Sequence, residues 1–124
     1  MTATIAMHSA LQELNQALDA PRVQGALGPW RKAVSERIAF VRDCLNREGP
    51  VASEGWLADR SKLMARERHS LLDRVLTVSA RMEQSEVDLL RMEIKRLMVD
   101  INHHVQRLHD LAYDDVEMEV GGSE

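Results

Sequence analysis

The chain has 124 residues, a net charge of −4, 29% charged residues and a single cysteine. This length suits one domain, which can bury about two-thirds of the surface that its unfolded chain exposes, so folding requires neither a disulfide nor a metal. Aromatic residues, which favour strands, are few, with one Phe, one Tyr and two Trp. The composition therefore favours helices.

The apolar pattern bears on localisation. The first residues have neither a basic start nor an apolar run of signal-peptide length, and no stretch approaches the ~20 apolar residues that span a bilayer. Cys44 has no second cysteine with which to form an internal disulfide. We therefore expect a cytoplasmic protein that does not act on a membrane.

The charges are distributed unevenly along the chain. Residues 22–81 carry twelve bases and seven acids, whereas residues 82–124 carry four bases and eleven acids. We expect these two segments to lie against each other and to neutralise. Nucleic-acid binding is not expected, because it requires an uncovered basic face with aromatic residues or glycines that approach the backbone.

The first two expected helices each carry one apolar face. The first covers residues 4–19 and ends before Pro21. The second opens at Pro29, in the first turn, where the missing N–H of proline costs nothing, and it ends at Gly49 and Pro50. The two apolar faces consist of Met7, Leu11, Leu14 and Leu18, and of Trp30, Val34, Ile38, Val41 and Leu45.

The third expected helix begins near Trp56 or Leu57 and carries two neighbouring apolar lines. Ser85, followed by Asp88, resembles a capping box and predicts a short turn near Gln84, which makes the third and fourth helices antiparallel. The first line contains Met64, Leu71, Val75, Val78 and Met82, and the second contains Ala65, Leu72 and Leu76, with His69 between Ala65 and Leu72.

The fourth expected helix contains the longest apolar line, over residues 87–111. Its members alternate at steps of three and four, which is the spacing of a helix packed against other helices. They are Val87, Leu90, Ile94, Leu97, Ile101, His104, Leu108 and Leu111. His104 stands where the spacing requires Leu or Ile, so any function beyond folding is expected to involve this position.

The pattern changes after Tyr113, where acidic residues and two glycines follow. We expect residues 114–124 to form a mobile acidic tail, with a short extended segment lying on the bundle as the alternative. Residues 1–113 are then one all-α domain, an antiparallel up-down four-helix bundle with short loops.

Ligand sites in helical bundles use side chains that point into the core from facing helices. His104 and His69 meet this condition by periodicity, Glu48 continues the apolar line of the second helix by one step, and His8 lies one step from Leu11. Imidazoles with a carboxylate and open positions suit iron or zinc. The alternative is that a buried histidine bonds to Glu48 or to a backbone carbonyl, because an unpaired one costs about 1–3 kcal/mol.

Three stretches, covering residues 30–57, 68–72 and 104–115, resemble hemerythrin-like (HHE cation-binding) four-helix bundles. The resemblance implies a metal site with His8, Glu48, His69 and His104 as ligands. The chain departs from the family pattern at three places, with Cys44 in place of the second-helix histidine, Asp73 in place of a further third-helix histidine, and Leu108 or His109 in place of a fourth-helix carboxylate. These departures imply either an altered, mononuclear site or a bundle that has lost its metal.

The first hypothesis for function is therefore a hemerythrin-like bundle whose reduced or degenerate iron or zinc site binds or senses a small ligand such as dioxygen. The alternative is a metal-free interaction or scaffolding bundle that binds a second copy or another protein, with His69 and His104 fixing the packing. A third hypothesis is an adaptor whose basic middle helices bind an acidic partner. We expect no catalytic residues, because no phosphate loop or serine nucleophile motif is present. Nothing specific supports a thiol enzyme based on Cys44.

Overall fold

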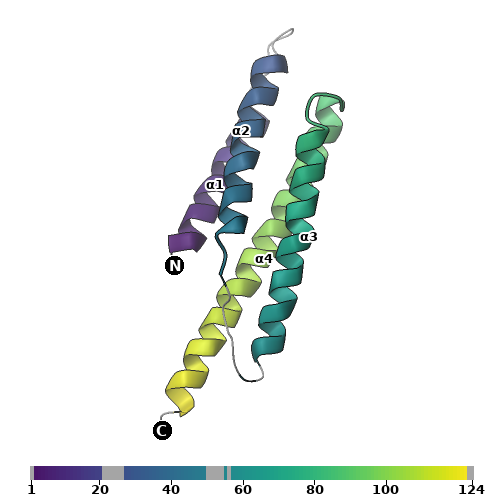
Figure 1. Ribbon diagram of the computed structural model, residues 1–124. Coiled ribbons are helices and arrows are strands. Elements are labelled where there is room, and N and C mark those ends of the chain that lie inside the picture. Colours follow the sequence, from purple (N-terminus) through teal and green to yellow (C-terminus); the bar gives the residue numbers. More distant parts are fainter. Residues whose placement is uncertain (1, 21–26, 50–54, 56, 123–124) are drawn as a thin grey trace.

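The computed structural model of the chain describes residues 2–20, 27–49, 55 and 57–122, with side chains for 5–20, 27–49, 55 and 57–114. These residues form four α-helices and no strand, which confirms the expected all-α class (Figure 1). The helices are α1 (Thr2–Asp19), α2 (Leu27–Asn46), α3 (Leu57–Ala80) and α4 (Val87–Gly122). The helix ends predicted at Pro21, Pro50 and Trp56 lie outside the described residues.

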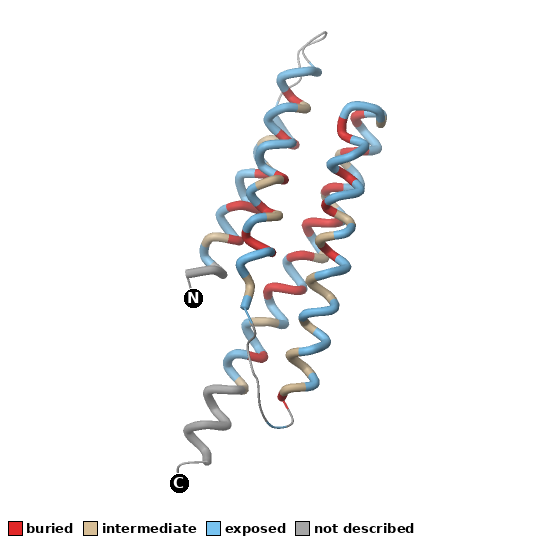
Figure 2. The backbone as a smooth tube through the Cα atoms, in the orientation of Figure 1, coloured by how far each residue is buried: buried red, intermediate tan, exposed pale blue. Residues whose placement is uncertain are grey.

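The four helices enclose one core. α1 packs on α2 and α4, and α3 packs on α2 and α4. In Figure 1, α1 lies beside α2 and α3 lies beside α4, and the buried positions in Figure 2 form stripes along the helices. None of the described helices has the length and apolar character needed to cross a membrane.

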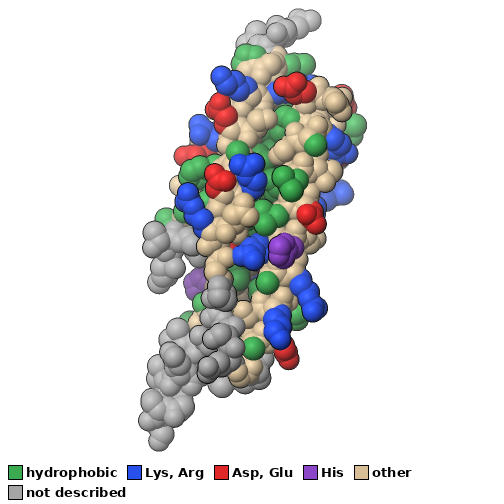
Figure 3. Space-filling view, in the orientation of Figure 1, with side chains coloured by type: hydrophobic (Ala, Val, Ile, Leu, Met, Phe, Trp, Pro, Cys, Tyr) green, Lys and Arg blue, Asp and Glu red, His purple; other side chains and the backbone are tan. Residues whose placement is uncertain are grey.

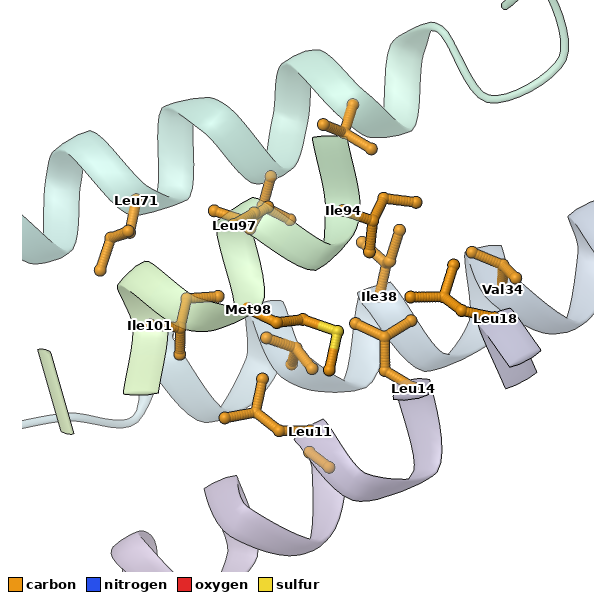
Figure 4. Close-up of a cluster of buried hydrophobic side chains, with 14 of the residues drawn as sticks. Leu11, Leu14, Leu18, Val34, Ile38, Leu71, Ile94, Leu97, Met98 and Ile101 are labelled. Atoms are coloured by element: carbon orange, nitrogen blue, oxygen red, sulfur yellow. The ribbon is translucent and has the colours of Figure 1, made fainter. Parts of the chain in front are cut away.

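The main core consists of hydrocarbon contributed by all four helices. Figure 4 shows Leu14 of α1, Ile38 of α2 and Ile94 of α4 pointing toward one another, with Leu71 of α3 at one side. Ile94 has no exposed surface and Ile38 is 2% exposed. Burying each such side chain stabilises the fold by about 1.5–3 kcal/mol.

One of the two apolar lines predicted for α3 is only partly buried. Leu71, Val75 and Val78 are buried as expected, but Leu76 on the neighbouring line is 55% exposed and His69 is exposed. The second line lies at the border of the buried stripe, so Leu72 still packs against the core, whereas Leu76 and His69 lie further round the helix and face outward.

A second, smaller apolar cluster lies beyond the C-terminal end of α2. It is formed by Leu57 and Leu111, with the half-buried Met64 packed against them. α4 continues from there to Gly122, so the segment predicted to be a tail is helical up to that residue. The side chains from residue 115 onward lie outside the described part.

Arginine–carboxylate pairs join α3 to α4 at four levels among the described residues. The pairs are Arg60 with Asp114 at 2.9 Å, Glu67 with Arg107 at 2.8 Å, Arg74 with Asp100 at 2.6 Å, and Arg81 with Glu93. Successive members are seven residues apart on each helix, which is the heptad spacing of coiled coils, and their order along α4 is the reverse of their order along α3. Three levels pair a base of α3 with an acid of α4, as the charge distribution predicted.

The turn between α3 and α4 is tied to α2. The guanidinium of Arg31 donates to the carbonyl of Met82 and, at 3.1 Å, to the carbonyl of Ser85. At the other end of α3, Gly55 has a φ of 72°, a left-handed conformation that glycine adopts without steric cost. Its carbonyl accepts a hydrogen bond from the N–H of Ala58 at 3.1 Å.

Candidate functional site: a buried histidine between two carboxylates

His104 lies on α4 between the main core and the smaller apolar cluster. Its side chain has no exposed surface. Among the residues whose side chains are described, His104 is the one polar or charged residue that is buried. The apolar spacing of α4 forces this burial, because Ile101 and Leu111 on either side of it occupy the same buried stripe. A polar ring in this position requires hydrogen-bond partners on both nitrogens.

Both ring nitrogens of His104 contact carboxylates. Nε2 lies 2.8 Å from an oxygen of Glu48, and Nδ1 lies 2.6 Å from an oxygen of Glu67. The side chains of Glu48 and Glu67 are themselves only 12% and 28% exposed. Since an ionised carboxylate only accepts, each nitrogen must carry a proton to donate to it, so this geometry fits the charged, doubly protonated ring.

The carboxylate of Glu48 is placed by the end of α2. Glu48 lies two residues after Asn46, the last residue of α2, and its N–H donates to the carbonyl of Leu45 at 3.3 Å. The Arg68 guanidinium on α3 donates to the Glu48 carbonyl at 2.5 Å. Glu67 and Arg68, adjacent on α3, therefore position the two sides of the site: one contacts the ring directly, and the other holds the backbone of the opposing carboxylate.

The environment favours the charged form of the ring. Burial by itself lowers the pKa of His104, but the carboxylates of Glu48 and Glu67 outweigh it and raise this pKa above the ordinary value of 6.5. Burial raises the pKa of Glu67, whereas Arg107 and His104 lower it, and the net effect lowers it below 4.5. Glu48, His104, Glu67 and Arg107 thus form a row of alternating charges with a net charge of zero.

The level containing Glu67 is the one at which the α3–α4 charge pattern is reversed. At the other three levels, α3 supplies the arginine, but here α3 supplies the acid and α4 supplies Arg107. The reversal places a carboxylate beside His104, where an arginine would face a buried cation. It also fixes the register, because sliding α3 by one heptad would set Arg60 against Arg107 and Glu67 against Asp100.

The predicted metal ligands are only partly brought together. Glu48 and His104 are in contact, but His69 is exposed on α3, and His8 is exposed in a groove between α1 and α4. No hydrogen bond or ion pair within the described part of the chain links His8 or His69 to the other two. The four-residue ligand set stays a prediction.

The two carboxylates at the site do not converge on one point suited to a metal. They contact opposite edges of the His104 ring, so a metal on either nitrogen could reach only one of them, and both nitrogens are already engaged. Accordingly, the described residues include no cluster of three or more His, Cys, Asp or Glu side chains placed to hold a metal ion. The arrangement fits hydrogen bonds from a doubly protonated His104 ring to Glu48 and Glu67 better than it fits metal coordination.

Cys44 is buried one turn before Glu48 and is 5% exposed. Burial raises the pKa of its thiol, which disfavours the thiolate that a nucleophile requires. Cys44 therefore packs as a small apolar side chain.

Glu67 is the site residue that sequence reasoning missed. The signal that could have identified it is its negative charge within a heptad series of charged residues. Positions 60, 67, 74 and 81 carry Arg, Glu, Arg and Arg, and positions 93, 100, 107 and 114 carry Glu, Asp, Arg and Asp. Aligning the two series in antiparallel order pairs every base with an acid. The single exchange of sign then falls beside His104, three residues before Arg107.

The comparisons with known proteins give no family assignment: no family model, curated protein or solved structure matches the chain.

Proposed function

We propose that the chain is a metal-free scaffolding bundle, antiparallel and up-down in topology, that acts by presenting rigid helical surfaces to other proteins. The observation that carries this proposal is the engagement of both nitrogens of the fully buried His104 by carboxylates at 2.6 and 2.8 Å. A metal ligand must offer an unprotonated nitrogen, and a ring that donates on both edges has none. His104 then serves to hold the C-terminal end of α2 and the middle of α3 against α4 in one register.

A hemerythrin-like metal site of iron or zinc is the second candidate. It is favoured by the contact between Glu48 and His104, which are two of the four ligands that the sequence resemblance implies. In this alternative the ring is neutral, its Nε2 binds the metal together with Glu48, and Nδ1–H donates to Glu67 as a supporting hydrogen bond. The site would bind or sense a small ligand, with no turnover of an organic substrate.

Elemental analysis of protein purified without a histidine tag distinguishes the two. The scaffolding proposal predicts no stoichiometric metal and the same trace content in the wild type and in His104→Ala. Iron or zinc near one equivalent that is lost in His104→Ala, and retained in His103→Ala, would establish the metal site instead. His103 is a matched control, because it is adjacent in sequence and exposed.

A further inference from the structure

The outward side of α4 carries a second helical line, opposite to the one in the core. Leu89, Met92, Arg96 and Val99 follow one another at steps of three, four and three, so they share one side of the helix. Leu89, Met92 and Val99 are 55%, 61% and 51% exposed. This spacing is typical of a helix that packs against a further helix, and we call these four residues the outer seam.

Grooves flank the outer seam on both sides. The one between α3 and α4 has a volume of about 330 Å³. Its α4 side consists of Leu89, Met92 and Arg96 of the outer seam, together with Glu93 and Leu97. The other lies between α1 and α4 and includes Val99 and Lys95. A ridge between two grooves is the surface relief into which the side chains of another helix interdigitate.

The charges around the outer seam indicate what kind of helix fits. Arg74 and Arg81 line the groove, but each already pairs with an acid of α4. Arg96 lies at the centre of the seam and has no hydrogen bond or ion pair with any residue that the structure describes. Covering this guanidinium with an apolar helix would be costly, because a desolvated charge needs a partner, whereas a carboxylate on the incoming helix would satisfy it.

A second copy of the chain fits this surface poorly. An antiparallel pairing that sets Leu89 against Val99 of the other copy places the two-fold axis near residue 94, and both Arg96 side chains then lie within one turn of each other. A parallel pairing sets Arg96 directly against Arg96. Like charges at the centre of an interface oppose association, so charge complementarity favours a different protein.

We propose that the outer seam, together with the groove between α3 and α4, docks an amphipathic helix of another protein whose apolar stripe includes a Glu or Asp facing Arg96. This inference rests on the scaffolding function proposed above and adds the chemistry of the partner. The apolar positions of the bound helix pack on Leu89, Met92 and Val99 and supply most of the buried area. The carboxylate selects the partner and its register.

The test uses a pair of synthetic helical peptides of about three heptads, with Leu at the apolar positions and either Glu or Lys at the position meant to face Arg96. Fluorescence anisotropy with the full chain is expected to show binding of the Glu peptide, at least about tenfold tighter than the Lys peptide. In Arg96→Glu the preference should reverse. Equal affinity of the two peptides for the wild type, or an unchanged preference in Arg96→Glu, overturns the proposal.

Two further variants locate the binding surface. Met92→Gln is expected to weaken binding of the Glu peptide about tenfold, whereas Leu76→Gln should leave it unchanged, since Leu76 is as exposed as the seam but does not line either groove. Equal losses in both variants, or a wild-type dimer that Met92→Gln dissociates in sedimentation, contradict the assigned partner. Metal content and thermal unfolding measured on the same samples show separately whether the scaffolding proposal itself has failed.

Discussion

The layers around Ile94 and around His104 belong to the same buried stripe of α4, yet they hold the helices together in different ways. Around Ile94, the neighbours are hydrocarbon from α1, α2 and α3, and any apolar side chain of the right volume can contribute. Around His104, each contact has a fixed direction and a fixed charge. The apolar layer supplies stability, whereas the polar layer specifies one alignment of α2, α3 and α4.

This difference extends to the surface charges. Figure 3 shows Lys and Arg side chains spread over the face of α2 and α3. The exposed ion pairs between α3 and α4 that some of these side chains form contribute about 0.2–1 kcal/mol each. The pair formed by Glu67 and Arg107 differs from them because Glu67 also contacts a buried ring. The stability that this pair contributes is therefore expected to depend on which helix carries the acid. The stability contributed by the other three α3–α4 ion pairs is not expected to depend on it.

The largest expected effect comes from truncating the apolar layer. Ile94→Ala removes a side chain with no exposed surface from the centre of the core and leaves a cavity there. Its free energy of unfolding should fall by about 2–5 kcal/mol, measured by urea denaturation. A loss below about 1 kcal/mol would show that the layer around Ile94 is loosely packed, contrary to this comparison.

Exchanging the acid and the base of one α3–α4 ion pair tests whether the layer around His104 requires a carboxylate on α3. In Glu67→Arg/Arg107→Glu the ion pair is kept, but a guanidinium replaces the carboxylate beside His104, and we expect a loss of about 1–3 kcal/mol. The matched control is Arg74→Asp/Asp100→Arg, which makes the same exchange where no buried histidine is in contact. It should change stability by less than about 0.5 kcal/mol. Equal losses in the two double variants would argue against any special role of Glu67.

The pH dependence of stability follows from the direction of the pKa shifts. The pKa of His104 is raised in the folded state, so its contribution is fully present below about 6.5 and is lost as the pH rises through the folded-state value. The pKa of Glu67 is lowered, so its contribution is present above about 4.5 and is lost as the pH falls through its folded-state value. Urea unfolding should therefore show a decline in stability on the alkaline side.

The control for this decline is a variant of an exposed histidine. His103→Gln should keep the alkaline loss, because its ring faces solvent on the same helix. A pH profile that is flat from about pH 6 to pH 9 in the wild type would be incompatible with a charged His104 in the folded protein.

The smallest net change is expected when the whole polar layer is replaced. His104→Leu alone leaves two carboxylates facing each other, and it should be destabilised. The triple variant Glu48→Met/His104→Leu/Glu67→Met removes all three groups and should be about as stable as the wild type or more so. It should also lose the alkaline decline in stability. A triple variant that is much less stable than His104→Leu would contradict this account.

The all-α class and the four helices were predictable from the sequence, because apolar spacing such as that of residues 87–111 is a local signal. The central position of His104 could also be predicted, since it interrupts an otherwise apolar line. The inward placement of His69 was wrong, because its line lies at the border of the stripe that α3 buries, and His69 faces outward from that border. Glu67 was missed because its role depends on which residue of α4 it faces, and that requires the register of the hairpin.

The central claim is that His104 is a protonated ring held between two carboxylates. NMR of the histidine ring nitrogens in the wild type tests it most directly. We expect both nitrogens of one histidine to remain protonated at about pH 7 and this residue to titrate above 6.5, with its signal absent in His104→Leu. A His104 ring that is neutral at that pH, or that titrates at or below 6.5, would show that the ring is not held as a cation between Glu48 and Glu67.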